Sequence, residues 1–187
     1  MRITGGKARG VQLKVPTRGP EIRPATDRMR EAVFSSLGSA IVGARVLDCF
    51  AGTGSYGLEA LSRGAASVDF LENSPHALRT ISENLARVEK SLASPCLFKT
   101  HRSSLPNLPA GLMGLFDIIF ADPPYAEIPD LLLPLVQTLV ERLTPSGIFV
   151  LECPNGIDPG LTDLKLLRSL GKKGKGSPTC LILTRNS

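Results

Sequence analysis

The chain has few residues of the kinds that build disulfides, metal centres or hydrolytic sites. Its 187 residues include only four cysteines and two histidines. The cysteines, Cys49, Cys96, Cys153 and Cys180, are widely spaced and form no C-x-x-C pair. This spacing favours reduced core thiols over disulfides or a metal site. His101 has no serine or cysteine at a recognisable spacing, which argues against a hydrolytic triad. We therefore expect no bound metal.

Long apolar runs are also missing from the sequence. No segment reaches the ~18 consecutive apolar residues that a membrane span requires, and no amino-terminal stretch joins a basic end to an apolar run. The hydrophobic share of 42% and the charged share of 21% are ordinary for a soluble globular protein. The length suits a single domain with one substantial core. We expect a cytoplasmic monomer that makes no contact with a membrane.

The excess positive charge lies in the amino-terminal residues. Residues 1–30 hold eight basic and two acidic side chains, a net charge of +6, whereas the remaining residues hold 14 basic and 15 acidic ones, a net charge of −1. A basic arm on a neutral body suits a partner with a phosphate backbone. The expected contacts are Arg2, Lys7, Arg9, Arg23, Arg28 and Arg30. Glycines between short alternating runs predict a small hairpin here, and the alternative is a solvated, flexible tail.

A glycine-rich turn follows an apolar stretch that resembles a buried strand. Residues 46–50 predict this strand, and residues 55–63 predict a helix after it. Three glycines lie at and just after the turn, Gly52, Gly54 and Gly57. A second predicted strand ends at Glu72, twenty positions after Gly52, where an acid can accept both hydroxyls of a ribose. The pattern indicates a nucleotide-type α/β fold.

The tetrapeptide Asp122-Pro123-Pro124-Tyr125 follows another apolar strand, expected over 116–121. Proline fixes its own φ and keeps the preceding residue extended, so the carbonyls here should point into a cleft at the end of the strand. The Asp122 carboxylate and a carbonyl of the Pro-Pro pair could accept both N–H groups of an exocyclic base amine, with Tyr125 stacked on the ring. Alternatively, the prolines only end a strand and Tyr125 packs on the surface.

Asp48 helps to decide which cofactor we expect at the glycine turn. The three glycines also fit the G-x-G-x-x-G pattern of dinucleotide-binding dehydrogenases. Asp48, however, lies inside the strand, where a carboxylate offers nothing to a pyrophosphate but can face a cofactor that carries a free amino group. Hydride transfer also has no use for the Asp122 tetrapeptide. S-adenosylmethionine explains both features, since it has an amino group, a ribose and a sulfonium methyl that an amine can attack.

These motifs resemble a known family. Residues 48–54, Glu72 and residues 122–125 are similar to class I S-adenosylmethionine-dependent methyltransferases of the amino-group type. Residues 2–10 and 23–34 resemble more specifically the bacterial 16S rRNA methyltransferases that modify the N2 amine of guanine 966. The resemblance implies 16S rRNA, free or in a partly assembled small subunit, as the partner. The cofactor contacts that we expect are Asp48, Phe50, Gly52, Gly54, Gly57, Glu72, Asn73 and His101.

The sequence departs from the fold family at one position, and three alternative functions also have to be considered. After the third strand the family commonly places Asp or Asn against the cofactor adenine, whereas this chain offers His101 or Ser103. DNA adenine-N6 methylation poses the same problem of an exocyclic amine, although the chain has no room for a separate base-reading domain. Glutamine-amide methyltransferases resemble Asn-Pro-Pro-Tyr rather than the sequence found here. A non-catalytic RNA-binding assembly factor is the alternative from another class.

Strands and helices alternate along the rest of the sequence. A helix capped by Thr26 or Asp27 should run to Leu37. Strands are expected over 46–50, 67–72, 95–99, 116–121, 147–152, 164–170 and 179–185, and helices over 55–63, 75–88 and 128–142. This order predicts a doubly wound, mostly parallel, seven-stranded Rossmann-like sheet over residues 25–187, preceded by a basic extension over 1–24. Ligands should bind beyond the carboxyl ends of the strands.

Overall fold

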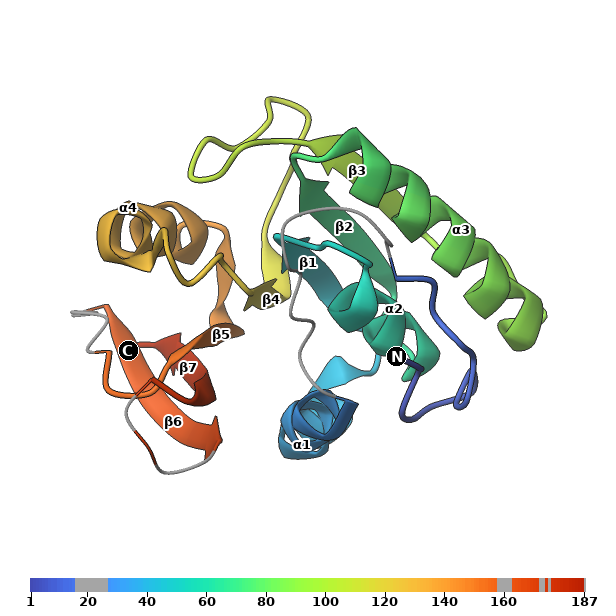
Figure 1. Ribbon diagram of the computed structural model, residues 1–187, viewed down its shortest axis with the longest axis horizontal. Helices are drawn as coiled ribbons and strands as arrows, with labels where there is room; N and C mark the ends of the chain where they lie inside the picture. The colour runs from blue at the N-terminus through green and yellow to red at the C-terminus, as the bar shows by residue number, and fades with distance from the viewer. Residues whose placement is uncertain (16–26, 158–162, 172–173, 175, 187) are drawn as a thin grey trace.

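The computed structural model describes residues 1–15, 27–157, 163–171, 174 and 176–186. The strands are β1 (Arg45–Cys49), β2 (Ser67–Glu72), β3 (Phe98–Arg102), β4 (Phe116–Ala121), β5 (Leu143–Pro154), β6 (Leu164–Gly171) and β7 (Pro178–Arg185). They form one seven-stranded sheet in the order β3-β2-β1-β4-β5-β7-β6 (Figure 1). Strands β1 to β5 are parallel, and β7 runs antiparallel to both β5 and β6. The predicted mostly parallel, seven-stranded sheet is confirmed.

Helices cover both faces of this sheet. They are α1 (Asp27–Leu37), α2 (Ser55–Ser62), α3 (Pro75–Leu92) and α4 (Ile128–Val140), with a short 3₁₀ helix over Gly38–Ile41. Figure 1 shows α1, α2 and α3 on one side and α4 on the other. Because both faces are covered, the central strands carry apolar side chains in both directions. Within the described ranges, no helix combines the length and the apolar character needed to cross a bilayer.

Two buried clusters fill the spaces on either side of the sheet. Phe70 and Phe120 belong to the cluster under α1, α2 and α3, whereas Leu47 and Ile119 belong to the cluster under α4. The assignment alternates along each strand because successive side chains point to opposite faces. The same alternation therefore tells us to which face of the sheet each side chain at the carboxyl end of a strand projects.

The limits of the third strand differ from the expected ones. β3 begins at Phe98 rather than at Pro95 and continues to Arg102. Proline has no N–H to donate to a strand ladder, and the N–H of Cys96 instead donates to the Glu89 side chain at 2.8 Å. Pairing with β2 can therefore start only after these two residues.

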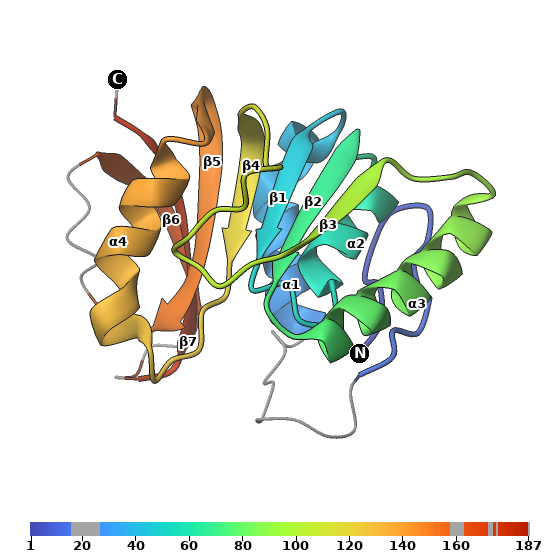
Figure 2. The ribbon, with the colours of Figure 1, turned by 90° about the horizontal axis from the view of Figure 1, so that it is seen from above.

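The first fifteen residues form a hairpin-shaped loop that lacks paired strands. Only Arg2 and Gln12 form an antiparallel bridge within this part of the chain. Lys7 N donates to the Ser62 carbonyl of α2 at 2.8 Å, and Figures 1 and 2 show the loop beside α2 and α3. Ile3 belongs to the cluster under α2. The extension thus shares the main core, and its predicted boundary at residue 24 lies outside the described residues.

Candidate active site

Four neighbouring strands each carry an acidic side chain at the same edge of the sheet. Asp48 lies near the end of β1, Glu72 ends β2, Asp122 directly follows β4, and Glu152 lies near the end of β5. The parallel register sets Asp48 opposite Phe120. Parallel strands bring their carboxyl ends together at one edge, so the three acids predicted for the site share it. Glu152 lies at the same edge, although the sequence analysis did not predict it as a site residue.

Two of these acids hold the glycine turn between β1 and α2. The Asp48 carboxylate accepts a hydrogen bond from Gly57 N at 2.8 Å. The Glu72 carboxylate accepts one from Gly52 N and one from Ser74 N, each at 2.8 Å. Both carboxylates are thus fixed in position, and Glu72 keeps further lone pairs for a ligand, because a carboxylate offers about four acceptor sites.

The three glycines at the turn have different structural roles. Gly52 and Gly54 have φ of +55° and +77°, a conformation that side-chain-bearing residues rarely adopt. A Cβ on Gly57 would lie 2.3 Å from the Phe70 ring, so this glycine lets α2 pack closely on β2. Because its N–H already donates to Asp48, the structure does not support a direct cofactor contact from Gly57. Phe50 also has positive φ, +57°, and leaves the strand there.

Three acids at this edge, Asp48, Asp122 and Glu152, bind protons more tightly than ordinary carboxyls. Burial raises the pKa of Asp48 to about 8, with Glu72 adding to the effect and the Gly57 hydrogen bond opposing it. Burial, followed by the charges of Glu152 and Asp48, raises the pKa of Asp122 well above its usual range. Burial also raises the pKa of Glu152, against the hydrogen bond from Tyr56. In the described part of the chain, no Lys, Arg or His forms an ion pair with Asp48, Asp122 or Glu152.

This arrangement fits S-adenosylmethionine better than a dinucleotide. Buried carboxyls without a counter-charge are stabilised by a positive ligand and destabilised by a pyrophosphate. The ammonium and the sulfonium of S-adenosylmethionine would supply positive charge to a site that holds Asp48 and Asp122, and its ribose would suit the free lone pairs of Glu72. Over the described residues, no cluster of His, Cys, Asp and Glu is arranged to hold a metal ion.

The Asp122 tetrapeptide leaves the sheet at this same edge. Pro123 is buried, whereas Tyr125 is 36% exposed and free to meet an incoming ring. The carbonyl of Pro124 accepts a hydrogen bond from Glu127 N at 2.9 Å. Since that carbonyl already closes a turn, the carbonyl of Pro123 is the better partner for a substrate amine.

Arg30 is not available to RNA, contrary to the sequence-based prediction. Its side chain is fully buried, pairs with Glu59 at 3.3 Å and with Asp27 at 2.9 Å, and also donates to the Arg2 carbonyl. Through these contacts Arg30 links the amino-terminal loop to α1 and α2. The other predicted RNA contacts in the described chain, Arg2, Lys7, Arg9 and Arg28, are exposed, and Arg23 lies outside the described residues.

His101 lies near the end of β3, where it pairs with Leu71, one residue before Glu72. Its Nε2 lies 2.8 Å from a carboxylate oxygen of Asp69, which precedes Glu72 by three residues on β2. This contact occupies Nε2, so the structure does not support the use of that nitrogen for the cofactor adenine. Asn73 follows Glu72 and is exposed, and its carbonyl accepts a hydrogen bond from Arg102 Nε at 3.3 Å.

Sequence analysis missed Glu152 and Tyr56. The Tyr56 hydroxyl donates to Glu152 at 3.2 Å, and its ring stacks on Phe120 with centroids 4.9 Å apart. Glu152 is an acid inside the otherwise apolar run of β5, the same signal that marked Asp48. The same signal could have identified Glu152 as a candidate site residue from the sequence.

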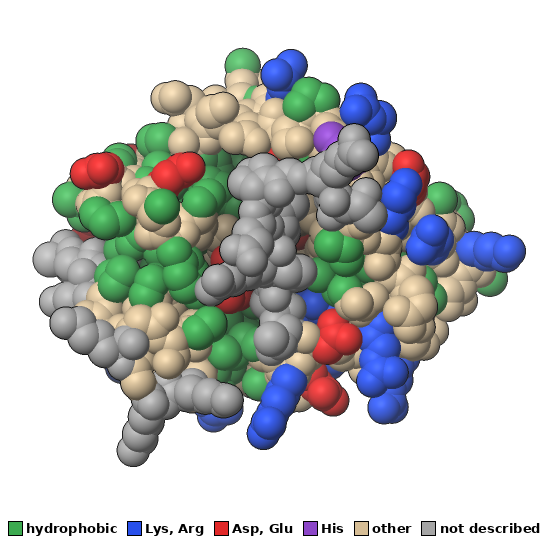
Figure 3. Space-filling model, viewed as in Figure 1, with side chains coloured by type: hydrophobic (Ala, Val, Ile, Leu, Met, Phe, Trp, Pro, Cys, Tyr) green, Lys and Arg blue, Asp and Glu red, His purple; other side chains and the backbone are tan. Residues whose placement is uncertain are grey.

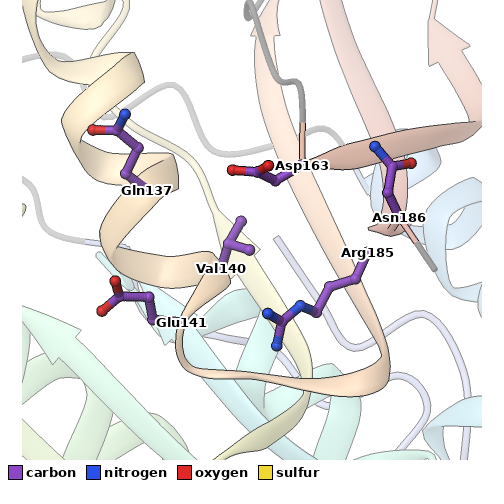
Figure 4. A pocket seen from close by; sticks show the side chains of 6 residues that line it. All are labelled: Gln137, Val140, Glu141, Asp163, Arg185 and Asn186. Carbon is purple, nitrogen blue, oxygen red and sulfur yellow. The ribbon is translucent and has the colours of Figure 1, made fainter.

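A separate pocket lies at the opposite edge of the sheet. Figure 4 shows its lining residues, Gln137, Val140, Glu141, Asp163, Arg185 and Asn186. Arg185 donates to the Leu143 carbonyl at the amino end of β5, whereas Glu152 lies near the carboxyl end of that strand. None of the predicted site residues lines this pocket.

Known proteins share both the sequence and this fold. The family model described as conserved hypothetical protein 95 matches residues 1–184. Ribosomal RNA small subunit methyltransferase D of Escherichia coli (strain K12) is 40% identical over 67% of this chain and 60% of its own length, so the match spans about three fifths of that relative. The protein of the same name from Haemophilus influenzae (strain ATCC 51907 / DSM 11121 / KW20 / Rd) is 34% identical over 67% of this chain and 64% of its own.

A solved structure extends the likeness over the whole chain. The structure of yhhF from Escherichia coli has a TM-score of 0.82 and 31% identity, covering 100% of this chain and 98% of its own. The glycine turn, Glu72 and the Asp122 tetrapeptide lie within the matched residues. The chain belongs to the family described as conserved hypothetical protein 95, a family of S-adenosylmethionine-dependent methyltransferases that includes ribosomal RNA small subunit methyltransferase D.

Proposed function

We propose that this chain transfers the methyl group of S-adenosylmethionine to the exocyclic N2 amine of a guanine in small-subunit rRNA, with guanine 966 of 16S rRNA as the target. The observation that carries the proposal is the position of Asp122, which leaves β4 beside the glycine turn and is followed by two prolines. The relatives named for small-subunit rRNA supply the class of substrate.

The proposed chemistry needs orientation more than a strong base. An exocyclic amine is a poor nucleophile because its lone pair is delocalised into the ring. The Asp122 carboxylate and the Pro123 carbonyl accept its two N–H groups, which aims the lone pair at the methyl carbon that the bound cofactor supplies. Holding two reactants in this way can be worth about 7–11 kcal/mol of the barrier. Tyr125 stacks on the base, because it is exposed beside Asp122.

Surface charge supports RNA as the partner. Figure 3 shows Lys and Arg side chains gathered over α3 and the amino-terminal residues. The exposed basic residues of the amino-terminal loop and α3 are Arg2, Lys7, Arg9, Lys14, Arg79, Arg87 and Lys90, and α1 adds Arg28. Phosphate contacts position a nucleic acid without reading its sequence, and the target base must leave its stack to reach the edge of the sheet.

Radiolabelled methyl transfer tests the proposal. The purified chain is incubated with labelled S-adenosylmethionine and with naked 16S rRNA, assembled small subunits, or duplex DNA. We expect label in rRNA, mapped by mass spectrometry to N2 of guanine 966. Transfer to DNA adenine would support the adenine-N6 alternative, and binding of rRNA without transfer would support an assembly factor. Either result would overturn the proposal.

A further inference from the structure

Glu152 and Asp122 occupy neighbouring positions on adjacent strands. Ala121 pairs with Leu151 in the β4–β5 register, so the next residues along the two chains are Asp122 and Glu152. Backbones of paired strands lie about 4.8 Å apart. Phe120 and Val150, two residues earlier, both face the cluster under α1 and α2. The two carboxyls therefore project to the same face of the sheet from neighbouring positions.

Tyr56 fixes one carboxyl of this pair. It lies in the first turn of α2 and is 5% exposed. Its ring packs against Phe34 and Phe120, with centroid distances of 6.3 and 4.9 Å, and those two rings also contact each other at 5.3 Å. The hydroxyl donates to Glu152 at 3.2 Å, and Cys180 Sγ lies 3.9 Å from the same oxygen. Glu152 is thus held rigidly beside Asp122, and the hydrogen bond favours negative charge on Glu152.

We propose that Glu152 is a positioning residue whose negative charge keeps Asp122 protonated in the ligand-free chain, and that Asp122 releases this proton when a cationic cofactor binds, so that Asp122 is an ionised acceptor only in the loaded enzyme. Two carboxyls this close cannot both ionise without a compensating positive charge. Glu152 keeps the charge that the pair carries, because the Tyr56 hydroxyl stabilises it there. The cofactor charge then permits Asp122 to ionise.

The titratable groups that face Asp122 come from every element packed around it. In the described structure they are Asp48 of β1, Tyr56 of α2, Tyr125, Glu152 of β5 and Cys180 of β7. A negative charge on Glu152 or on Asp48 disfavours a charge on Asp122. The thiol and the phenols stay neutral, because burial raises their pKa above the usual range.

The charge on Asp122 matters for the transfer itself, and this step rests on the proposed function. An ionised Asp122 accepts an N–H of the guanine amine. The nitrogen lone pair forms the N–C bond while the C–S bonding pair stays on sulfur. Asp122 then takes the proton that the nitrogen loses, and gives it to solvent when the product leaves. A protonated Asp122 cannot take that proton, and it is a weaker acceptor for the N–H.

Proton release on cofactor binding tests the inference without any RNA. Titration calorimetry of the ligand-free chain with S-adenosylmethionine at pH 7, in two buffers of different ionisation enthalpy, reports the protons released. We expect the wild-type chain to release more protons than Glu152→Gln, because Asp122 is protonated to a smaller extent once the Glu152 charge is gone, whereas any proton released from Asp48 is common to both proteins. Equal release by both proteins would overturn the inference.

The pH profile of methyl transfer gives the second measurement. Glu152→Gln keeps the shape of the side chain but removes its charge, so the acid limb of kcat should shift by about one pH unit to lower pH. Asp69→Asn, an amide change at a buried acid on the opposite face, should leave the limb in place. A uniform loss of kcat without a shift would make Glu152 merely structural. Should the wild-type chain transfer no methyl to rRNA, the proposed function fails, while the calorimetry still decides the role of Glu152.

Discussion

Arg30 of α1 and Glu59 of α2 form an ion pair at 3.3 Å in which both side chains are fully buried. Glu59 also accepts hydrogen bonds from Thr4 N, Thr4 Oγ1 and Gly5 N, each at 2.8 Å. One carboxylate thus joins the amino-terminal loop to two helices. The loop that carries the exposed basic side chains is consequently fixed relative to the glycine turn at the start of α2.

Replacing Glu59 with glutamine should lower the free energy of unfolding by up to about 3–5 kcal/mol, because the buried Arg30 loses its fully buried carboxylate partner and keeps the partly exposed Asp27. Urea unfolding monitored by circular dichroism measures this. Glu83→Gln is the matched control, since Glu83 pairs with Lys14 on the surface and its loss should change stability little. Equal effects of the two changes would contradict the role given to Glu59.

The stability of the ligand-free protein should fall as pH rises from about 4 to about 8. The pKa of Asp48 is about 8 in the folded chain, against a value of 3.8 for the unperturbed group. Between these values the folded state keeps a proton that the unfolded state has released, so each pH unit costs up to about 1.4 kcal/mol. Asp48→Asn should flatten the curve measured by urea unfolding. A variant curve parallel to the wild-type curve would argue against a neutral Asp48.

Changing Asp122 to alanine should abolish turnover and spare cofactor binding. In the proposed site the Asp122 carboxylate contacts the target amine, whereas Asp48 and Glu72 line the cofactor end, so kcat should fall about 100-fold or more. Single-turnover kinetics and calorimetry with S-adenosylmethionine separate the two effects. A variant that retained most of its rate would rule out the assigned contact.

Tyr125 should contribute through its ring rather than its hydroxyl. Tyr125→Phe keeps the stacking surface and should leave KM for rRNA nearly unchanged. Tyr125→Ala should raise KM by about 5- to 150-fold, the equivalent of about 1–3 kcal/mol for one stacked base. Steady-state kinetics on a small rRNA fragment check both. A large effect of the phenylalanine variant would point to the hydroxyl instead.

The amino-terminal loop should set the salt dependence of RNA binding. Lys7 and Arg9 are exposed, and removing two phosphate contacts should reduce the slope of log K against log salt by about 1.4–1.8. Filter binding at several salt concentrations measures the slope for the double alanine variant. Lys165 and Arg168, exposed on β6, provide a matched double variant that should keep the wild-type slope.

The local features of the site could be predicted because each depends on neighbours in sequence. The apolar run before Gly52, the positive φ that this glycine permits, and the extended backbone imposed by Pro123 and Pro124 are all short-range properties. Their assignment to the ends of parallel strands followed from the alternation of strands and helices. The predicted monomer and cytoplasmic location stay predictions.

Long-range contacts explain the residues that sequence analysis misplaced. Arg30 looked like a surface cation, because a basic side chain on a short helix usually points to solvent. The carboxylate of Glu59, 29 residues away, forms an ion pair with Arg30 and stabilises its buried position. His101 was assigned from its distance after the third strand, but Asp69 on the neighbouring strand holds its ring.

By itself, the sequence determined the order of strands and helices, the glycine turn and the rigid Asp122 tetrapeptide, since backbone preference and apolar periodicity act over a few residues. The tertiary structure alone decided which charged side chains face the ligand edge and which are buried. Burial and partner choice depend on residues brought together by strand pairing and helix packing. Glu152 shows this most clearly, because its place beside Asp122 comes from the β4–β5 register and its orientation from Tyr56 on α2.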